Sequence, residues 1–240
     1  MLLEICASSY QSAINAQHSG AHRIELCSEL AVGGITPSYG LLKNVLAAVT
    51  IPVSVLIRPR SGNFTYSEAE FTIMKTDIQM CKELGCNGIV SGVLNPDNTI
   101  DIVRTQELIK LAKPLEFTFH RAFDWIENSF EALEQLITIG AARVLTSGKK
   151  QTALEGMKLL KVLKERAKNK IIILPGGGII KENAHLFKNM EFKEIHCSAS
   201  LIRYQKADEK LSMNNQKLFD DRIIVHSDGD TIKAILDSIS

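Results

Sequence analysis

Short apolar runs alternate with helical patterns along the whole chain, and this alternation is the strongest constraint on the fold. The runs are rich in β-branched residues, which is typical of buried strands. Eight such strands are predicted, at residues 2–7, 23–28, 52–60, 88–94, 115–121, 142–146, 171–174 and 194–199. Strands spaced about 20–30 residues apart with helices between them predict a (β/α)8 TIM barrel of parallel strands, in a single domain covering residues 1–240.

Helical signals occupy the connections between these strands. The predicted helices span residues 9–19, 36–48, 67–84, 101–112, 129–139, 152–167, 181–187 and 230–239. A doubly wound open sheet is the alternative fold, but it needs a glycine-rich fingerprint after the first strand, where this chain has Ser8-Ser9-Tyr10. Residues 203–222 are predicted as a long polar connection before the C-terminal helix, either a flap over the barrel mouth or an oligomer contact.

Composition excludes several classes of protein. A net charge of +1 gives no reason to expect a nucleic-acid or membrane-surface partner. No segment approaches the roughly 20 apolar residues of a membrane-spanning helix, and Glu4 interrupts any N-terminal signal peptide. The five cysteines form no CxxC pair, which disfavours a disulfide framework or a structural zinc site. We therefore expect a cytoplasmic protein with reduced thiols.

Polar side chains gather at the predicted strand ends. In a barrel the C-terminal ends of the strands meet at one mouth, where active sites lie. On the first two strands, alternation places Glu4, Cys6, Glu25 and Cys27 on one face if the strands are neighbours. The other candidates are Arg58, Arg60, His120, Arg121, Asp124, Ser147 and His196.

Arg58 and Arg60 stand on either side of Pro59 at the end of the third strand, and alternation predicts that they project to the same side. Two buried guanidinium groups are costly unless they meet an anion or carboxylates. We expect them to face Glu4 and Glu25 across the mouth. A solvated basic loop beginning at Arg58 is the alternative.

Two interpretations of this polar mouth stay open. It is either a structural ion-pair network that fills the barrel or a site for an anionic substrate. In a catalytic site, Glu4 or Glu25 would be the general base and His120 or His196 the general acid. No lysine lies at a strand end, which disfavours a Schiff-base aldolase, and no organic cofactor is expected.

The run Pro175-Gly176-Gly177-Gly178 follows the seventh strand. Glycines at this position let backbone N–H groups approach a phosphate before the next helix begins. Gly176, Gly177 and Gly178, together with Ser198 after the eighth strand, are therefore candidate anion-binding residues.

Cys6 and Cys27 each lie two residues after a glutamate on neighbouring predicted strands. Two thiolates that meet inside a barrel suit Cu(I), which prefers soft ligands. The alternative is that both are small buried apolar residues, the commonest role of free cysteine. HxxxH and HxH spacings are absent, which disfavours a hydrolytic zinc site.

Six motifs together resemble the CutC copper-homeostasis family. They are Arg23-Ile24-Glu25-Leu26-Cys27-Ser28, Gly33-Gly34-Ile35-Thr36-Pro37-Ser38, Ile57-Arg58-Pro59-Arg60, Phe119-His120-Arg121-Ala122-Phe123-Asp124, Arg143-Val144-Leu145-Thr146-Ser147-Gly148 and Pro175-Gly176-Gly177-Gly178-Ile179. Two positions depart from the family pattern. Ser61 replaces the first glycine after the Arg-Pro-Arg run, and Ser91 replaces an aromatic residue in the fourth strand.

The resemblance implies a cytoplasmic TIM-barrel protein of copper homeostasis, a homo-oligomer such as a dimer or tetramer, that binds Cu(I). It implies that the copper thiols are Cys6 and Cys27. The alternative function is a metal-independent enzyme, a lyase, isomerase or hydrolase, acting on a small anionic metabolite that is possibly phosphorylated. Its substrate would bind at the C-terminal mouth of the barrel.

Overall fold

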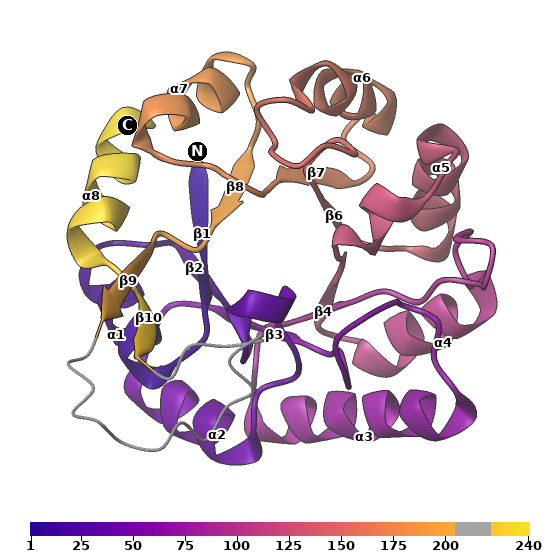
Figure 1. Ribbon diagram of the computed structural model, residues 1–240. Coiled ribbons are helices and arrows are strands. Elements are labelled where there is room, and N and C mark those ends of the chain that lie inside the picture. Colours follow the sequence, from indigo (N-terminus) through magenta and orange to yellow (C-terminus); the bar gives the residue numbers. More distant parts are fainter. Residues whose placement is uncertain (205–221) are drawn as a thin grey trace.

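The structure is a computed structural model that describes residues 1–204 and 222–240, and it is a TIM barrel (Figure 1). Eight parallel strands pair in the order β7-β6-β5-β4-β3-β2-β1-β8. A single parallel bridge between Gly176 and His196 closes the barrel between β7 and β8. The strands are β1 (Leu2–Ala7), β2 (Arg23–Leu26), β3 (Val53–Leu56), β4 (Gly88–Ser91), β5 (Glu116–Phe119), β6 (Arg143–Thr146), β7 (Ile172–Pro175) and β8 (Glu194–Cys197).

Helices surround the barrel and follow each strand. They are α1 (Tyr10–His18), α2 (Tyr39–Ala48), α3 (Glu68–Leu84), α4 (Ile102–Ala112), α5 (Ser129–Ile139), α6 (Met157–Ala167), α7 (Lys181–Asn189) and α8 (Gly229–Ser238). Two short 3₁₀ segments, η1 (Leu30–Val32) and η2 (Arg121–Trp125), lie in the loops at the mouth. None of the helices in the described ranges is long and apolar enough to cross a membrane.

The apolar core lies between the barrel and the helices. Outward strand residues such as Leu3, Ile5 and Ile24 are fully buried there. On α3, Phe71 and Met74 belong to a buried face with helical spacing. The predicted barrel is therefore confirmed, and the apolar runs were strands because they are covered on their outer face by helices.

Several predicted boundaries were wrong. The strands predicted at 88–94 and 115–121 end at Ser91 and Phe119. The helix predicted from residue 152 begins at Met157 and has Gly156 as its N-cap. A Cβ on Gly156 would stand 1.9 Å from the carbonyl oxygen of Ser147. Glycine is required at that approach.

An antiparallel pair of strands, β9 (Ser200–Tyr204) and β10 (Ile223–Ser227), was not predicted. The pair lies beside α1, where the Ser227 N–H donates to Ser12 Oγ over 3.0 Å. The Asn15 side chain donates to the Ser227 carbonyl over 2.9 Å. The predicted polar connection 203–222 therefore begins within β9 and ends one residue before β10, and its residues 205–221 lie outside the described residues.

A capping box begins α3. The Glu70 N–H donates to Ser67 Oγ, and Glu70 Oε2 accepts from the Ser67 N–H over 2.7 Å. Replacing Ser67 with alanine is expected to lower the free energy of unfolding by about 1 kcal/mol, since the N-terminal N–H loses its acceptor. Urea unfolding measures this. Thr72→Ala on the exposed side of the same helix is the control and should change stability by less than about 0.5 kcal/mol; equal losses would contradict the assignment.

Charged side chains fill the N-terminal half of the barrel interior. Glu194 Oε2 accepts from Arg23 Nη2 over 2.6 Å and from Arg143 Nε over 2.8 Å. Arg23 also pairs with Glu4, and Arg143 Nη1 pairs with Glu116 over 2.6 Å. We call these five residues the ionic layer. An ion-pair network thus lies below the mouth, but of the residues predicted at the mouth it contains Glu4 alone.

Candidate functional site

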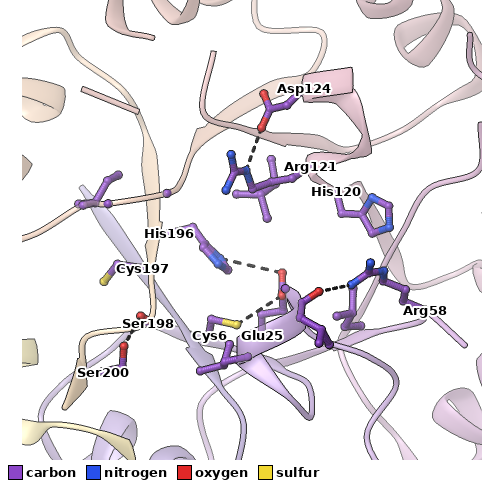
Figure 2. Close-up of a pocket in the computed structure, with 18 of the residues that line it drawn as sticks. Cys6, Glu25, Arg58, His120, Arg121, Asp124, His196, Cys197, Ser198 and Ser200 are labelled. Atoms are coloured by element: carbon purple, nitrogen blue, oxygen red, sulfur yellow. Dashed lines mark hydrogen bonds and ion pairs between the residues drawn. The ribbon is translucent and has the colours of Figure 1, made fainter. Parts of the chain in front are cut away.

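A cavity of about 870 Å³ opens at the C-terminal mouth of the barrel, above the ionic layer (Figure 2). Its size is within the usual range for small-molecule sites. Ten residues predicted from the sequence line it: Cys6, Glu25, Arg58, His120, Arg121, Asp124, Gly177, Gly178, His196 and Ser198. Five others, Glu4, Cys27, Arg60, Ser147 and Gly176, are not among its lining residues.

At the floor of the cavity, Cys6, Glu25 and His196 present a thiol, a carboxylate and an imidazole within 4.8 Å of one another. They come from β1, β2 and β8, which are adjacent around the barrel. His196 Nδ1 is 2.8 Å from Glu4 Oε1 and 4.0 Å from Glu25 Oε2. Figure 2 shows Cys6 and His196 both directed at the Glu25 carboxylate. This group, the floor cluster, is a mixed sulfur, oxygen and nitrogen set that is able to hold a metal ion.

Glu4 and Glu25 differ in their protonation although both are buried. Burial raises the pKa of Glu4, but the hydrogen bond from His196 and the charge of Arg23 outweigh it and lower the pKa to about 2. Burial also raises the pKa of Glu25, and the nearby Glu4 carboxylate adds to it, so the pKa reaches about 7 despite His196. Glu25 Oε2 has no hydrogen-bond partner. Glu4 is therefore a structural carboxylate beneath the cavity, and Glu25 is the carboxyl group that a ligand meets.

The thiols of Cys6 and Cys27 lie 3.6 Å apart, as their strand positions predicted. Cys6 Sγ also lies 3.7 Å from Glu25 Oε1. The hydrogen bond to Cys27, burial and the neighbouring carboxylates all raise the pKa of Cys6 well above its ordinary value. The Cys6 thiol therefore keeps its proton at neutral pH.

The structure separates the two arginines that the sequence placed together. Arg58 lines the cavity and is 5% exposed. Its Nη1 donates to the carbonyls of Val32 and Gly34, and its Nη2 to that of Gly62, each within 2.9 Å. Although Arg58 and Glu25 line the same cavity, Arg58 forms no ion pair with Glu4 or Glu25, so the expected pairing of charges was wrong.

Arg60 was also misplaced. It forms an ion pair with Glu70 at 2.5 Å outside the cavity, and its guanidinium group lies over the Tyr66 ring. The reason is that the hydrogen-bonded strand ends at Leu56, so the strand alternation no longer holds at Arg60.

His120 is held in one tautomer. The Ala122 N–H donates to His120 Nδ1 over 3.2 Å, so in the neutral ring the proton is on Nε2. Burial, together with the charge of Arg58, lowers the pKa of His120 to about 3. The His120 Nε2 atom has no hydrogen-bond partner.

A hydrogen-bonded group beside the cavity is formed by Arg121, Asp124 and Ser147. Arg121 Nε donates to Asp124 over 2.8 Å, and its Nη2 donates to Ser147 Oγ over 2.7 Å. Asp124 also accepts from the Ser147 N–H and Oγ. Ser147 is fully buried, so it positions Arg121 and does not meet a ligand.

Of the predicted anion-binding residues, Gly177 and Gly178 have positive φ angles of 101° and 69°, which other residues rarely adopt. Gly176 instead packs in the barrel wall, where a Cβ would stand 2.6 Å from Leu145 Cδ1. Ser198 Oγ lies at the cavity rim, 2.9 Å from Ser200 Oγ.

The sequence reasoning missed several residues that shape the site. Arg23 pairs with Glu4 below the cavity, and Glu194 joins Arg23 to Arg143. Arg23 and Glu194 lie two positions before the predicted site residues Glu25 and His196, and Arg143 lies four positions before Ser147. Extending the alternation backward along each strand would have found them. Thr231 and Ile235 of α8 also line the cavity, and no local pattern marks them.

Comparisons with known proteins agree with this fold. Residues 1–201 match the model of the CutC family. The human copper homeostasis protein cutC homolog is 48% identical over 203 residues, 84% of this chain and 74% of that protein. The CutC family protein of Histophilus somni is 44% identical over 238 residues, 98% of each chain.

Among solved structures, CutC from Streptococcus agalactiae superposes with a TM-score of 0.78 at 36% identity, covering 82% of this chain and 98% of that one. An aldolase, QR15, superposes with a TM-score of 0.62 at 13% identity, which shows a shared fold alone.

Proposed function

Because this chain belongs to the CutC family, we propose that it is a cytoplasmic protein of copper homeostasis that binds Cu(I) through Cys6 and Cys27. The observation that carries the proposal is the 3.6 Å separation of the two thiols in the interior of the barrel mouth. Thiolates are the soft ligands that Cu(I) prefers.

The surroundings of the two thiols fit a monovalent cation. The imidazole of His196 and the carboxyl group of Glu25 lie within 4.8 Å of the Cys6 sulfur. Either group offers a third ligand without rearrangement of the strands. Glu4 holds His196 through a 2.8 Å hydrogen bond, and carboxylates that orient a ligating imidazole strengthen metal sites. Buried carboxylates also favour a positive charge at this position.

Competition of the copper-free protein with a Cu(I)-specific chelator, under anaerobic reducing conditions, tests the proposal. We expect one Cu(I) per chain in the parent protein. The Cys6→Ala, Cys27→Ala double variant should bind at least about 100-fold more weakly, since it loses both soft ligands.

Cys81→Ala is the matched control, since Cys81 is an equally buried thiol on α3, remote from the mouth. It should keep the affinity of the parent. Equal affinity of the parent and the double variant would refute the copper site. Native mass spectrometry of the same samples reports the copper content together with the oligomeric state.

The location and assembly are parts of the same proposal. All five cysteines are free, which suits a reducing compartment such as the cytoplasm. A homo-oligomer, a dimer or tetramer, is supported by exposed apolar side chains on the two strands after the barrel. They are Leu201, Ile202, Tyr204 and Ile223.

A further inference from the structure

A buried positive charge without a carboxylate partner borders the cavity at Arg58. Its guanidinium group donates three hydrogen bonds, all to backbone carbonyls, and no Asp or Glu side chain of the described ranges forms an ion pair with it. Phe64 covers the group, 5.1 Å from ring centroid to guanidinium carbon. Carbonyl dipoles solvate the cation but do not neutralise it, so burial leaves a positive potential on this side of the cavity.

A hydrogen-bond donor without an acceptor lies beside Arg58. His120 packs on the same Phe64 ring, with centroids 4.9 Å apart. The backbone N–H of Ala122 fixes the proton on Nε2, and this buried N–H is unsatisfied. An unpaired buried donor costs about 1–3 kcal/mol, which an oxygen atom of a ligand would recover. We call Arg58 and His120 the Arg58–His120 wall.

A second group of donors belongs to residues that line the cavity after β7. Within the part of the chain that the structure describes, the backbone N–H groups of Gly177, Gly178 and Ile179 make no hydrogen bond. Arg121 Nη1 is likewise without an acceptor, and a Cβ on Gly177 would stand 3.2 Å from it. Both the glycine turn and Arg121 line the cavity.

We propose that the cavity binds a small organic anion, a carboxylate or a phosphate ester. Its ligands would be the Arg58–His120 wall on one side, and Arg121 with the turn of Gly177, Gly178 and Ile179 on the other. The observations share one sign, because both groups offer positive charge and N–H donors, although Arg121 is also paired with Asp124 through Nε. Within the described residues, the donors without an acceptor are His120 Nε2, Arg121 Nη1 and the three N–H groups of the turn. Cys6 lines the same cavity, but none of the proposed anion-binding donors is a thiol, so anion binding and copper binding are tested separately. The bound anion would be the substrate of the metal-independent enzyme that the sequence offered as an alternative.

Titration of the copper-free full chain with inorganic phosphate and with malonate tests the proposal. Proton–nitrogen NMR spectra of the histidine rings report on His120 directly, and a His120→Gln variant assigns its signal. We expect the Nε2–H tautomer in the free protein and a saturable shift of the His120 signal with at least one anion. The surface residue His18 should not follow the same curve.

The two arginines provide matched variants. Arg58→Gln should weaken anion binding by at least about tenfold, while Arg60→Gln, whose side chain pairs with Glu70 outside the cavity, should not change it. Tighter binding of malonate or of phosphate identifies a carboxylate or a phosphate ester as the ligand class. If Arg58→Gln does not fold, the tautomer of His120 and the shifts of its signal in the parent protein decide whether the anion site exists.

The proposal is overturned if neither anion binds saturably, if His120 carries its proton on Nδ1, or if the two arginine variants lose affinity equally. Chelator competition on the parent protein is a separate readout. If the parent protein binds no Cu(I) in that competition, the copper site is refuted and the anion site is untouched.

Discussion

Replacing Glu194 with glutamine is expected to lower the free energy of unfolding by about 3–5 kcal/mol. Glu194 Oε2 accepts hydrogen bonds from both Arg23 and Arg143 in the ionic layer, and all three side chains are less than 10% exposed. The substitution keeps the volume but leaves two buried guanidinium groups with one carboxylate fewer. Breaking a buried network costs far more than the net stability it provides, because the remaining charges stay desolvated.

Chemical denaturation measures this loss, and thermal unfolding should show a fall in Tm of about 10 °C or more for a chain of this size. Glu191→Gln is the control, since Glu191 is exposed and its ion pair with Lys164 is 3.6 Å long. Its effect should stay within about 0.5 kcal/mol. A Glu194 variant as stable as the parent would mean that the ionic layer rearranges around the lost charge.

Replacing Glu25 with glutamine is expected to stabilise the copper-free protein at alkaline pH. Its pKa in the folded protein is about 7, above the ordinary 4.5, because burial outweighs the attraction of His196. Such a group favours folding below pH 4.5, and the protein loses that advantage as the pH rises through 7. The gain from Glu25→Gln should therefore be small at pH 4.5 and reach about 3 kcal/mol at pH 8.

Urea unfolding of the parent and the variant at pH 5 and pH 8 gives the difference. Glu191→Gln should show no comparable pH dependence. A Glu25→Gln variant that loses stability at pH 8 would contradict the raised pKa. A gain would identify Glu25 as a residue retained for function at a cost in stability.

The fold followed from the sequence because each strand is short, apolar and covered by its own helix. Glu4, Cys6 and Glu25 met as expected, since alternation holds within hydrogen-bonded parallel strands. Arg60 was misplaced because the ladder of β3 ends at Leu56, and alternation has no physical basis beyond it. The strands β9 and β10 were missed because β9 is exposed throughout and β10 is mostly half-buried, so neither shows an alternating burial pattern.

The chemistry of the cavity required coordinates. Nothing in the sequence indicates that Arg58 meets carbonyls rather than Glu25, or that the Ala122 N–H selects the tautomer of His120. The opposite pKa shifts of Glu4 and Glu25 also depend on which one reaches Arg23 and His196. Residue type and spacing predict which side chains gather at a mouth, whereas partners and solvation decide their charge.

The pairing between neighbouring strands is uneven around the barrel, because β7 and β8 meet at the single bridge between Gly176 and His196. The other seven pairs of neighbouring strands are joined by ladders of two to four residue pairs, whereas β7 and β8 share this one bridge. We therefore expect transient local opening of the sheet to cost least at this seam. Since His196 belongs to the floor cluster, we expect such opening to move the imidazole, and a ligand held by His196 to slow amide exchange along β8.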